Sequence, residues 1–575
     1  MSGRGQLLIV VVTFALAGTA GLWALSATRP MLRAPGGQEV LADPDSYMRW
    51  RLVERALAGE GVRIRWVPDD NAPRGRLNEW MSPMTMIGVM AVKVMGPGAG
   101  QWLGPVMGLI ILAALGWWGW RAGGWPVAVY WLVAWPALTA VRQVTQFGNT
   151  DHHSLHQLVF VCLAGGCLAR PRESGVWVGL VTALGMWTAG SEMLPAWALV
   201  AGLAIREARS ETGFWRAWWV SGLMGTTAAW LFEFWPHVFH GHLEFISAWH
   251  VGLWCVTGGL LEFLRSERQR SRQVIAVLAA VALALILAGA TRGFDWGHLH
   301  VMQDAFMRRQ FERTVEFGSP LKDGIGALWR GYGLLVPAWM VLALSQWKKA
   351  DERERWLMLV AGTCCLLMMR EGRWGSFFVV ALVMNVGLLL PRRRPWLCAG
   401  LIVVATLPAW WQVAQSRRQA QQVAANPVRG PYGTTFVMEA VSGCLGGRPV
   451  VLATWDQGAV LAGMGKVRVI GSGYWSNAEG LRAAHEMFST RSPERFWELV
   501  REREVEYFLV PPPELLAEAI QDSTVISGGR LPSLPEVKQT VAWQVASRGN
   551  FPVVACEPMA RIAPQGSILD LRRKP

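Results

Sequence analysis

Long apolar runs are the feature that most restricts what this chain can fold into. Uncharged stretches of 15–21 residues recur up to about residue 412. About 20 apolar residues cross the hydrocarbon core of a bilayer as a helix. The chain has 575 residues, 52% apolar and only 17% charged, with a mean hydropathy of +0.25. Soluble proteins carry about 25% charged residues, so a soluble multidomain protein is excluded. The sequence predicts a polytopic α-helical membrane protein.

Basic residues between the apolar runs predict the orientation of the chain. Short loops rich in Lys and Arg remain on the cytoplasmic side of a membrane. We therefore place five loops in the cytoplasm, those with Arg170/Arg172, Arg206/Arg209, Arg265/Arg268/Arg270/Arg272, Lys348/Lys349/Arg353/Arg355 and Arg392/Arg393/Arg394. Much of the net charge of +14 lies in these loops, so we expect no nucleic-acid partner. The 34 Trp residues are typical of membrane–water interfaces.

About thirteen spans follow from this orientation. Residues 7–27 form an uncleaved anchor, because the run is longer than a signal-peptide core and no A-x-A site follows it. Residues 83–96 number only 14 and include Lys93, which favours an interfacial or re-entrant helix on the outer side. The other predicted spans are 101–120, 124–141, 155–169, 174–189, 192–206, 214–232, 246–264, 273–291, 326–346, 356–370, 374–390 and 395–412.

The composition changes after Ser416, which predicts two domains. Residues 1–416 form the transmembrane domain with its outer loops, whereas residues 417–575 contain alternating apolar stretches bounded by Gly and Pro. This pattern predicts a soluble α/β domain on the outer face of the cytoplasmic (inner) membrane. Cys444 and Cys556 lie in this domain, where oxidation is permitted. The sequence leaves open whether they form a disulfide or remain free thiols.

Acidic and basic side chains collect in an outer loop, DPDSYMRWR, that follows the first span. Asp43 and Asp45 form a D-x-D pair that can bind a divalent cation or leave one carboxylate free to act on a substrate. The same pattern also initiates turns, which is the alternative interpretation. Arg49 and Arg51 are candidates for contact with phosphate.

A second outer loop, TDHHSLHQ, carries a candidate metal site at the start of the 155–169 span. Asp151 and His153 can bind one ion, and mixed oxygen and nitrogen ligands suit Mn²⁺ or Mg²⁺ better than a structural zinc. Asp151 can instead cap the helix that follows. His156 lies about one turn from His152, and we interpret it as a hydrogen-bonding residue of the helix face.

Two further groups lie at outer ends of spans. Arg373 is a candidate phosphate clamp at the membrane surface, with Arg370 as a weaker candidate; the alternative is an interfacial anchor. A second histidine group, His237, His240 and His242 with Glu244, has spacing that could bind metal. Nothing else in the sequence supports a metal there, so we interpret this group as interfacial polar residues.

The order of these motifs resembles that of the catalytic subunit of oligosaccharyltransferase and its single-subunit archaeal and bacterial relatives. DSYMRWR is similar to the first acidic motif of that family, in a register that favours Asp45 over Asp43. TDHH is similar to the second motif, RTVE (313–316) to a loop motif that ends in Glu, and RWGSFFVV to a late span that begins with Arg. TWDQG (454–458) resembles the family's W-W-D-x-G motif, with Thr454 in place of the first Trp.

The resemblance implies a glycosyltransferase of the GT-C type, with a single subunit that acts as a monomer. Its expected substrates are a polyprenyl-diphosphate-linked glycan and an acceptor Asn of a secreted polypeptide. Asp45 and Glu316 would act on the acceptor amide, with Asp43 as a further catalytic candidate. Asp151, His153 and Asp45 would bind Mn²⁺ or Mg²⁺, and Arg373 and Arg370 the donor diphosphate. Trp455, Asp456 and Thr454 would hold the acceptor by the hydroxyl of the Ser or Thr that follows two residues after the Asn.

Two alternatives stay open at this point. Another GT-C transferase, which moves a polyprenyl-linked sugar to a lipid or to Ser/Thr, would share the acidic loops and the metal without needing TWDQG. A transporter would need polar groups at the middle of the membrane. Apart from Glu192, which we expect at a span end, the predicted spans offer few polar groups besides Ser and Thr.

Overall fold

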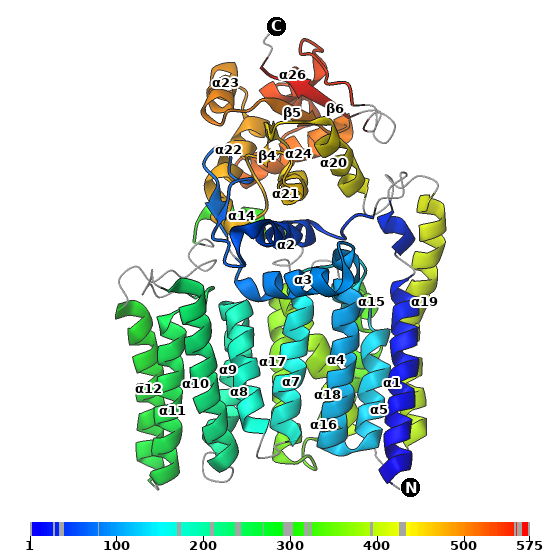
Figure 1. Ribbon diagram of the computed structural model, residues 1–575, viewed down its shortest axis with the longest axis vertical. Helices are drawn as coiled ribbons and strands as arrows, with labels where there is room; N and C mark the ends of the chain where they lie inside the picture. The colour runs from blue at the N-terminus through cyan, green and yellow to red at the C-terminus, as the bar shows by residue number, and fades with distance from the viewer. Residues whose placement is uncertain are drawn as a thin grey trace.

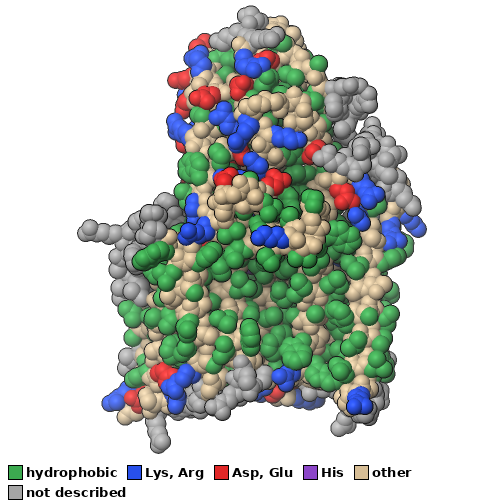
Figure 2. Space-filling view, in the orientation of Figure 1, with side chains coloured by type: hydrophobic (Ala, Val, Ile, Leu, Met, Phe, Trp, Pro, Cys, Tyr) green, Lys and Arg blue, Asp and Glu red, His purple; other side chains and the backbone are tan. Residues whose placement is uncertain are grey.

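The computed structural model has a helical bundle at one end and an α/β domain at the other (Figure 1). It describes residues 3–26, 29–33, 39–78, 80–169, 174–207, 212–235, 243–267, 269–290, 303–314, 320, 325–390, 395–424, 433–556, 559 and 566–572. On the face drawn in Figure 2, hydrophobic side chains predominate over the bundle, and Lys, Arg, Asp and Glu gather at its lower rim, above it and on the α/β domain. This apolar belt is the surface that a protein in a bilayer requires.

The bundle consists of helices that run side by side (Figure 1). Each predicted span overlaps one of them or two in succession. They are α1 (Gly3–Leu25), α4 (Ala99–Gly123), α5 (Trp125–Ala137), α6 (Thr139–Thr145), α7 (His153–Ala169), α8 (Ser174–Thr188), α9 (Gly190–Glu207), α10 (Thr212–Phe234), α11 (Ala248–Ser266), α12 (Arg270–Ala290), α15 (Ile325–Tyr332), α16 (Leu335–Gln346), α17 (Glu352–Arg370), α18 (Gly375–Leu389) and α19 (Pro395–Ala424).

Four segments of the described residues are long and apolar enough to cross a membrane by length and composition alone, namely Gly3–Leu25, Ala99–Gly123, Gly372–Leu389 and Cys398–Gln419. The pair α5 and α6 makes a fifth if it is counted as one span, although it bends by 73°. Pro136 lies near the end of α5, where its ring and its missing N–H interrupt the helical hydrogen bonds. Other bundle helices, such as α7 and α8, are shorter. The total of about thirteen spans therefore stays a prediction.

Tryptophan fills much of the bundle core. Trp131, Trp135, Trp215, Trp218 and Trp254 are fully buried there. The indole N–H of Trp131 donates a hydrogen bond to the backbone oxygen of Met384 at 3.1 Å, which joins α5 to α18. The interpretation of the Trp excess as an interfacial feature is thus only part of the account, because these five rings pack helix against helix.

Two helices lie across the top of the bundle, between it and the α/β domain (Figure 1). They are α2 (Pro44–Arg55) and α3 (Ser82–Met95), and α3 is the short apolar segment with Lys93. Between them are η2 (Ala56–Glu60), β1 (Trp66–Val67) and β2 (Arg76–Leu77), the two strands pairing antiparallel. The 3-10 helix η1 (Arg29–Leu32) precedes α2.

The α/β domain is built on a four-stranded sheet in the order β4-β3-β5-β6. β3 pairs parallel with β4 and β5, and β5 pairs antiparallel with β6. Its elements are α20 (Gly433–Cys444), β3 (Val450–Leu452), α21 (Trp455–Met464), β4 (Arg468–Val469), η6 (Trp475–Asn477), α22 (Ala478–Ser489), α23 (Pro493–Glu502), β5 (Tyr507–Val510), α24 (Pro513–Ile526), α25 (Leu534–Val537), α26 (Val541–Ser547) and β6 (Ser567–Asp570).

A disulfide between Cys444 and Cys556 closes this domain, which answers the question that the sequence left open. It ties the end of α20 to the segment before β6, 112 residues further along the chain. The last bundle helix, α19, continues past Ser416 to Ala424. The first described element of the α/β domain is α20, which begins at Gly433.

A close contact between α2 and α21 fixes the α/β domain over the bundle. A Cβ atom at Gly463 of α21 would lie 2.6 Å from Cβ of Tyr47 and 2.8 Å from the backbone nitrogen of Met48, so only glycine allows this approach. Tyr47 and Met48 are buried in the same apolar cluster as residues of α21. The contact anchors the last turn of α21 on the first turns of α2.

Candidate functional site

A cavity of about 640 Å³ lies where the bundle, α2 and the α/β domain meet. Ligand sites in proteins commonly have volumes of about 300–1,000 Å³ and few, well-placed polar groups. Residues from distant parts of the chain line this active-site cavity, among them Asp43, Asp45, Arg49, His152, Glu192, Glu244, Arg313, Arg373, Trp455, Asp456 and Tyr474. The cavity therefore joins most of the motifs that the sequence singled out.

The N-terminus of α2 brings both carboxylates of the D-x-D pair to the cavity. Asp43 is the N-cap of α2, and its Oδ1 accepts a hydrogen bond from the backbone N–H of Ser46 at 2.6 Å. Its Oδ2 accepts one from the side chain of Asn149 at 3.2 Å. Asp45 lies in the first turn, where its Oδ1 accepts a hydrogen bond from the hydroxyl of Tyr474 at 2.7 Å. Asp43 therefore has a structural role in capping, whereas Asp45 is held by the α/β domain.

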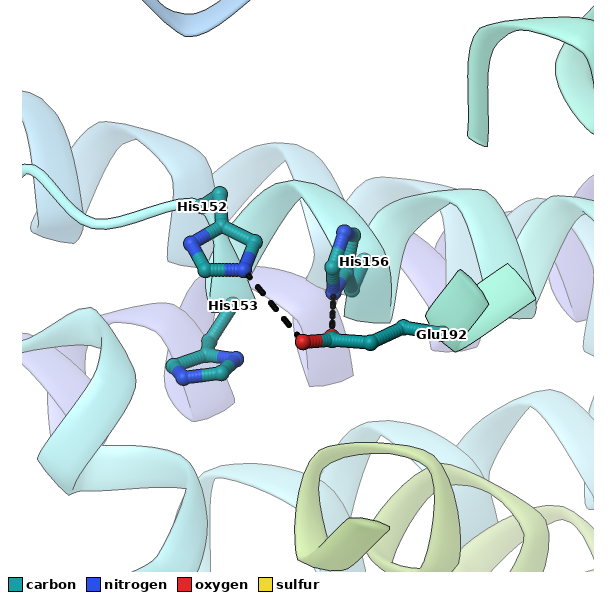
Figure 3. Close-up of side chains that lie close together, drawn as sticks. All are labelled: His152, His153, His156 and Glu192. Carbon is teal, nitrogen blue, oxygen red and sulfur yellow. Dashed lines mark ion pairs between the residues drawn. The ribbon is translucent and has the colours of Figure 1, made fainter. Parts of the chain in front are cut away.

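Three histidines and one glutamate form a compact group beside α2, which we call the histidine cluster. His152, His153, His156 and Glu192 each offer a ligand atom, and these atoms lie within 4.8 Å of one another. Figure 3 shows the three rings and the carboxylate directed toward one another. Glu192 Oε2 lies 3.0 Å from Nδ1 of His156, and Glu192 Oε1 lies 3.9 Å from Nε2 of His152.

Asp151 stands behind two of these histidines. Its Oδ1 lies 2.5 Å from Nδ1 of His152 and its Oδ2 lies 3.3 Å from Nε2 of His153. Burial alone would raise the pKa of Asp151, but His152, His153 and Arg49 together hold it well below its usual range. A carboxylate at Nδ1 of His152 leaves the Nε2 side of the ring turned to Glu192, an arrangement that orients histidine ligands of metals.

The histidine cluster fits a divalent cation. Two ligand atoms of one zinc-sized ion lie at most about 4.2 Å apart, because each bond is about 2.0–2.2 Å long. The ligand atoms of the cluster lie within 4.8 Å of one another, so a small rotation of the side chains brings them to this separation. His156 is fully buried, and neither of its ring nitrogens has a hydrogen-bond partner of good geometry. Three imidazoles and one carboxylate are typical zinc ligands. This donor set is richer in nitrogen than the predicted pair of Asp151 and His153.

Arg49 joins α2 to the histidine cluster. Its side chain is 4% exposed, with Nη2 at 2.6 Å from Nδ1 of His152 and Nε at 3.4 Å from Oδ1 of Asp151. The guanidinium also lies over the ring of Trp80, 4.3 Å from its centre. Arg51 points elsewhere, to Asp69 and Glu54. Of the two arginines, only Arg49 lines the cavity.

The two predicted diphosphate ligands separate in space. Arg373 lies in η4 (Gly372–Trp374) and lines the cavity, with a side chain that is 9% exposed. Its Nε donates a hydrogen bond to Oε2 of Glu371 at 2.9 Å. Arg370 ends α17 with a side chain that is 83% exposed. Arg370 is not among the described residues of the cavity wall, so the arrangement favours Arg373 alone.

The WDQG segment forms the start of α21. Trp455 and Asp456 line the cavity, whereas Thr454 precedes the helix and faces a smaller pocket beside it. The hydroxyl of Thr454 donates a hydrogen bond to Oδ1 of Asp456 at 2.5 Å. Gly458, the last residue of the motif, packs against the backbone of Gly471. The motif thus brings an indole and a carboxylate from the α/β domain to the cavity.

Glu316 lies outside the described residues, as do His237, His240 and His242. The residues just before Glu316, Arg313 and Thr314, line the cavity. They follow α14 (Ala305–Phe311), which packs against α22 and α24 in an apolar cluster with Trp455.

Glu244, from the second histidine group, also lines the cavity, where it accepts a hydrogen bond from Ser191. Gly190 allows this approach, because a Cβ atom there would meet the backbone oxygens of Leu243 and Glu244 at 2.8 and 2.9 Å.

Three residues of the site were missed by the sequence interpretation as functional side chains, namely His156, Glu192 and Tyr474. The i, i+4 spacing of His152 and His156 was a usable signal, since it places both rings on one helix face. The lone Glu192 at the start of an apolar helix was a second signal. Tyr474 lies in a loop without a motif, so only the fold reveals it.

Solved structures offer a comparison for this arrangement. No protein-family model matches the sequence, and no curated protein matches it either. An oligosaccharyltransferase of Archaeoglobus fulgidus, AglB, in complex with an inhibitory peptide and a dolichol-phosphate, superposes with a TM-score of 0.70 at 12% identity. The match covers 93% of this chain and 72% of that one. This chain has the fold of an archaeal oligosaccharyltransferase.

Further structures of that Archaeoglobus fulgidus enzyme agree. One is tethered to an acceptor peptide with an NVT sequon and superposes with a TM-score of 0.69, at 12% identity and with 93% and 72% of the two chains covered. Another, in complex with Zn and sulfate, has a TM-score of 0.66 at 12% identity, with 92% and 70% covered. The predicted resemblance to oligosaccharyltransferases is therefore confirmed for the fold, and at 12% identity the likeness shows the fold alone.

Proposed function

We propose that the chain is a membrane glycosyltransferase that moves a glycan from a polyprenyl diphosphate to the side-chain amide of an Asn in a secreted polypeptide. The observation that carries the proposal is the cavity itself. One space of about 640 Å³ is lined by Asp45, by His152 and Glu192 of the histidine cluster, by Arg373 and by Trp455 with Asp456. Each of these groups serves a different requirement of the reaction.

The acceptor amide needs activation, because its nitrogen lone pair is delocalised into the carbonyl. Asp45 accepts one N–H of the amide, and Glu316 is the candidate for the second. These hydrogen bonds weaken the delocalisation and leave a carboxylate to take the released proton. The C1–O bond to the diphosphate breaks as the C1–N bond forms, and the polyprenyl diphosphate leaves.

The departing diphosphate needs positive charge. Arg373 and Arg49 line the cavity, and Arg313 adds a third guanidinium to its wall. Guanidinium groups bind phosphate oxygens with short, charge-assisted hydrogen bonds. A divalent cation bound by the histidine cluster would supply further stabilisation of the leaving-group charge when present. Its donor set favours zinc, and Mn²⁺ or Mg²⁺ with Asp151, His153 and Asp45 is the alternative.

The acceptor polypeptide would bind against the α/β domain. In the family that the motifs resemble, the W-W-D-x-G segment reads the hydroxyl two residues after the Asn, and Trp455 and Asp456 occupy two of its three key positions. The disulfide in this domain supports its location in an oxidising compartment outside the cytoplasm. The apolar surface of the bundle supports a place in a membrane. We assign the chain to the cytoplasmic membrane, with the lipid-linked donor in the outer leaflet and a single subunit as the active form.

The test is glycan transfer by the purified full-length chain in lipid nanodiscs. The donor is the polyprenyl-diphosphate glycan extracted from the source cells, and the acceptor is a fluorescent peptide with an Asn-Ala-Thr sequence, analysed by mass spectrometry. We expect a glycan on the Asn, and loss of at least tenfold in rate with Trp455→Ala or Asp456→Ala. Glu514→Gln, an exposed carboxylate of α24 outside the cavity wall, is the control.

Two outcomes would contradict the proposal. Transfer that survives both changes at Trp455 and Asp456 would exclude Asn transfer guided by this segment. A glycan found only on lipid or on Ser/Thr would identify another GT-C reaction.

A further inference from the structure

A second pocket adjoins the active-site cavity, and we call it the side pocket. Its volume is about 260 Å³, and it lies between the start of α21 and α24. Trp455 and Asp456 line both spaces. A polypeptide held against these two residues can therefore extend a neighbouring side chain into the side pocket.

The side pocket carries an excess of negative charge. Asp456, Glu518 and Asp522 line it, and none of its described lining residues is Lys or Arg. Asp522 pairs with Arg313 of the loop after α14. Within the part of the chain that the structure describes, Asp456 and Glu518 form no ion pair with a guanidinium. Clustered carboxylates next to low-dielectric walls attract a cation and disfavour an anion.

The inner part of the side pocket is apolar. Ala484, Phe488 and Pro511 are buried there, and Leu515, which is 52% exposed, forms part of the rim. A long side chain with a methylene stem and a charged head matches this division, because its stem covers apolar surface while its head meets the carboxylates.

The one histidine in the wall adds no positive charge near neutral pH. His485 places Nδ1 at 2.9 Å from Oγ of Ser523 and Nε2 at 2.8 Å from Oε1 of Gln310. An amide oxygen only accepts, so Nε2 carries the proton and Nδ1 accepts from the serine. Burial lowers the pKa of His485 to about 4, which keeps the ring neutral.

Thr454 leaves the side pocket open. It lines the pocket, and its hydroxyl is engaged by Oδ1 of Asp456 at 2.5 Å. A larger side chain at position 454 would fill part of the same space. The substitution of Thr for the first Trp of the motif therefore coincides with an additional binding volume.

We propose that the side pocket binds a Lys or Arg side chain of the acceptor polypeptide, close in sequence to the modified residue. The proposal rests on the proposed function only in taking a polypeptide as the acceptor. The charged head meets Glu518 and Asp456, and the stem packs on Phe488 and Leu515. A preference for a cationic residue would then distinguish the acceptors of this chain.

The experiment measures binding separately from transfer. Fluorescent peptides with a central Asn-Ala-Thr carry Lys, norleucine or Glu at each flanking position in turn, and their dissociation constants for the full-length chain in nanodiscs are measured by anisotropy. We expect one position at which Lys binds about tenfold tighter than norleucine, and Glu more weakly than both, as a charge-assisted hydrogen bond at a partly exposed site predicts.

Two variants and one control identify the pocket. Glu518→Gln reduces the preference for Lys severalfold, and Thr454→Trp weakens binding of the Lys peptide by filling the space. Glu514→Gln removes a carboxylate one turn away on the same helix, outside the pocket wall, and retains the preference. The same preference in wild type and Glu518→Gln would overturn the proposal, as would equal affinities for Lys and norleucine at every position.

The transfer assay separates this inference from the proposed function. Glycan transfer to Asn without any preference for Lys refutes the side-pocket assignment alone. A preference for Lys in binding, without transfer to Asn, refutes the proposed reaction alone. If no peptide binds the wild-type chain, both are wrong.

Discussion

The hydroxyl of Tyr474 donates a hydrogen bond to Asp45 across the cavity, which makes Tyr474→Phe a sharp test of the site. The hydrogen bond is 2.7 Å long. The phenol ring is held on two sides, by Trp80 with ring centres 5.0 Å apart and by the guanidinium of Arg76 at 4.3 Å. Phenylalanine keeps the ring and both ring contacts, and it removes the hydroxyl that donates to Asp45.

The expected loss follows from the charge of the acceptor. A hydrogen bond to a charged group contributes about 1.5–3 kcal/mol. Asp45 faces an open cavity, where water replaces part of the lost bond, so the lower value applies. A loss of about 1.4 kcal/mol is tenfold in rate. We therefore expect kcat for glycan transfer to fall about tenfold in Tyr474→Phe, with the KM for the acceptor peptide unchanged within about twofold.

A matched control is Tyr507→Phe, a tyrosine of β5 in the same domain that does not line the cavity. Both variants should unfold at the temperature of the wild type. Unchanged kcat in Tyr474→Phe would refute the role of Asp45 as a catalytic carboxylate positioned by this bond. A rise in KM alone would instead indicate that Tyr474 contacts the acceptor.

Three further predictions concern charge, covalent structure and metal. Lowering the pH from 7 toward 4 should reduce the free energy of unfolding of the α/β domain by up to about 3 kcal/mol. The reason is that the unfolded state binds a proton at His485 below pH 6.5, whereas the buried ring, with a pKa of about 4, does not. Denaturant titrations of wild type and His485→Asn check this, and an equally steep pH dependence in the variant would contradict it. The double change Cys444→Ser and Cys556→Ser should destabilise the same domain by about 4–5 kcal/mol, since the disulfide closes a loop of 112 residues. An unchanged melting temperature of the double variant would show that the disulfide does not constrain the unfolded chain. Glu192→Gln should lower the zinc content of the purified chain at least tenfold, as measured by mass spectrometry of the metal. Glu244→Gln, in the same cavity wall, should leave the zinc content unchanged. Equal zinc in the wild type and both variants would exclude the histidine cluster as the binding site.

The membrane fold was predictable because its signal is local. Each span is a continuous apolar run, and the helices α1 and α4 begin and end within a few residues of the predicted limits. Asp45, Arg373 and Trp455 were predictable for a related reason, since each belongs to a short motif that can be recognised without knowing its neighbours. Arg370 ends α17 and lies away from the described cavity wall, whereas Arg373 lies three residues later in the turn of η4, where the backbone changes direction.

The remaining site residues depend on contacts between distant segments. Glu192 meets His156 across α7 and α9, and Tyr474 meets Asp45 over 429 residues of chain. Periodicity and motif spacing carry no information about such pairs. The burial of five Trp residues between helices was not predicted, because composition alone does not distinguish an indole at a membrane interface from one between helices.

The position of α2 has a consequence for which polypeptides can react. Thr150, next to the histidine cluster, donates hydrogen bonds to the side chain and backbone of Ser46 at 3.0 and 2.9 Å, and Gly463 of α21 packs on the following turn. α2 is thus held between the segment that carries the histidine cluster and the last turn of α21. In the proposed reaction the acceptor extends from Asp45 to Trp455 and Asp456 at the start of α21, and the anchored α2 keeps these two points a constant distance apart. Insertion of a single residue between those two points of the polypeptide would shift the reacting amide by up to about 3.5 Å.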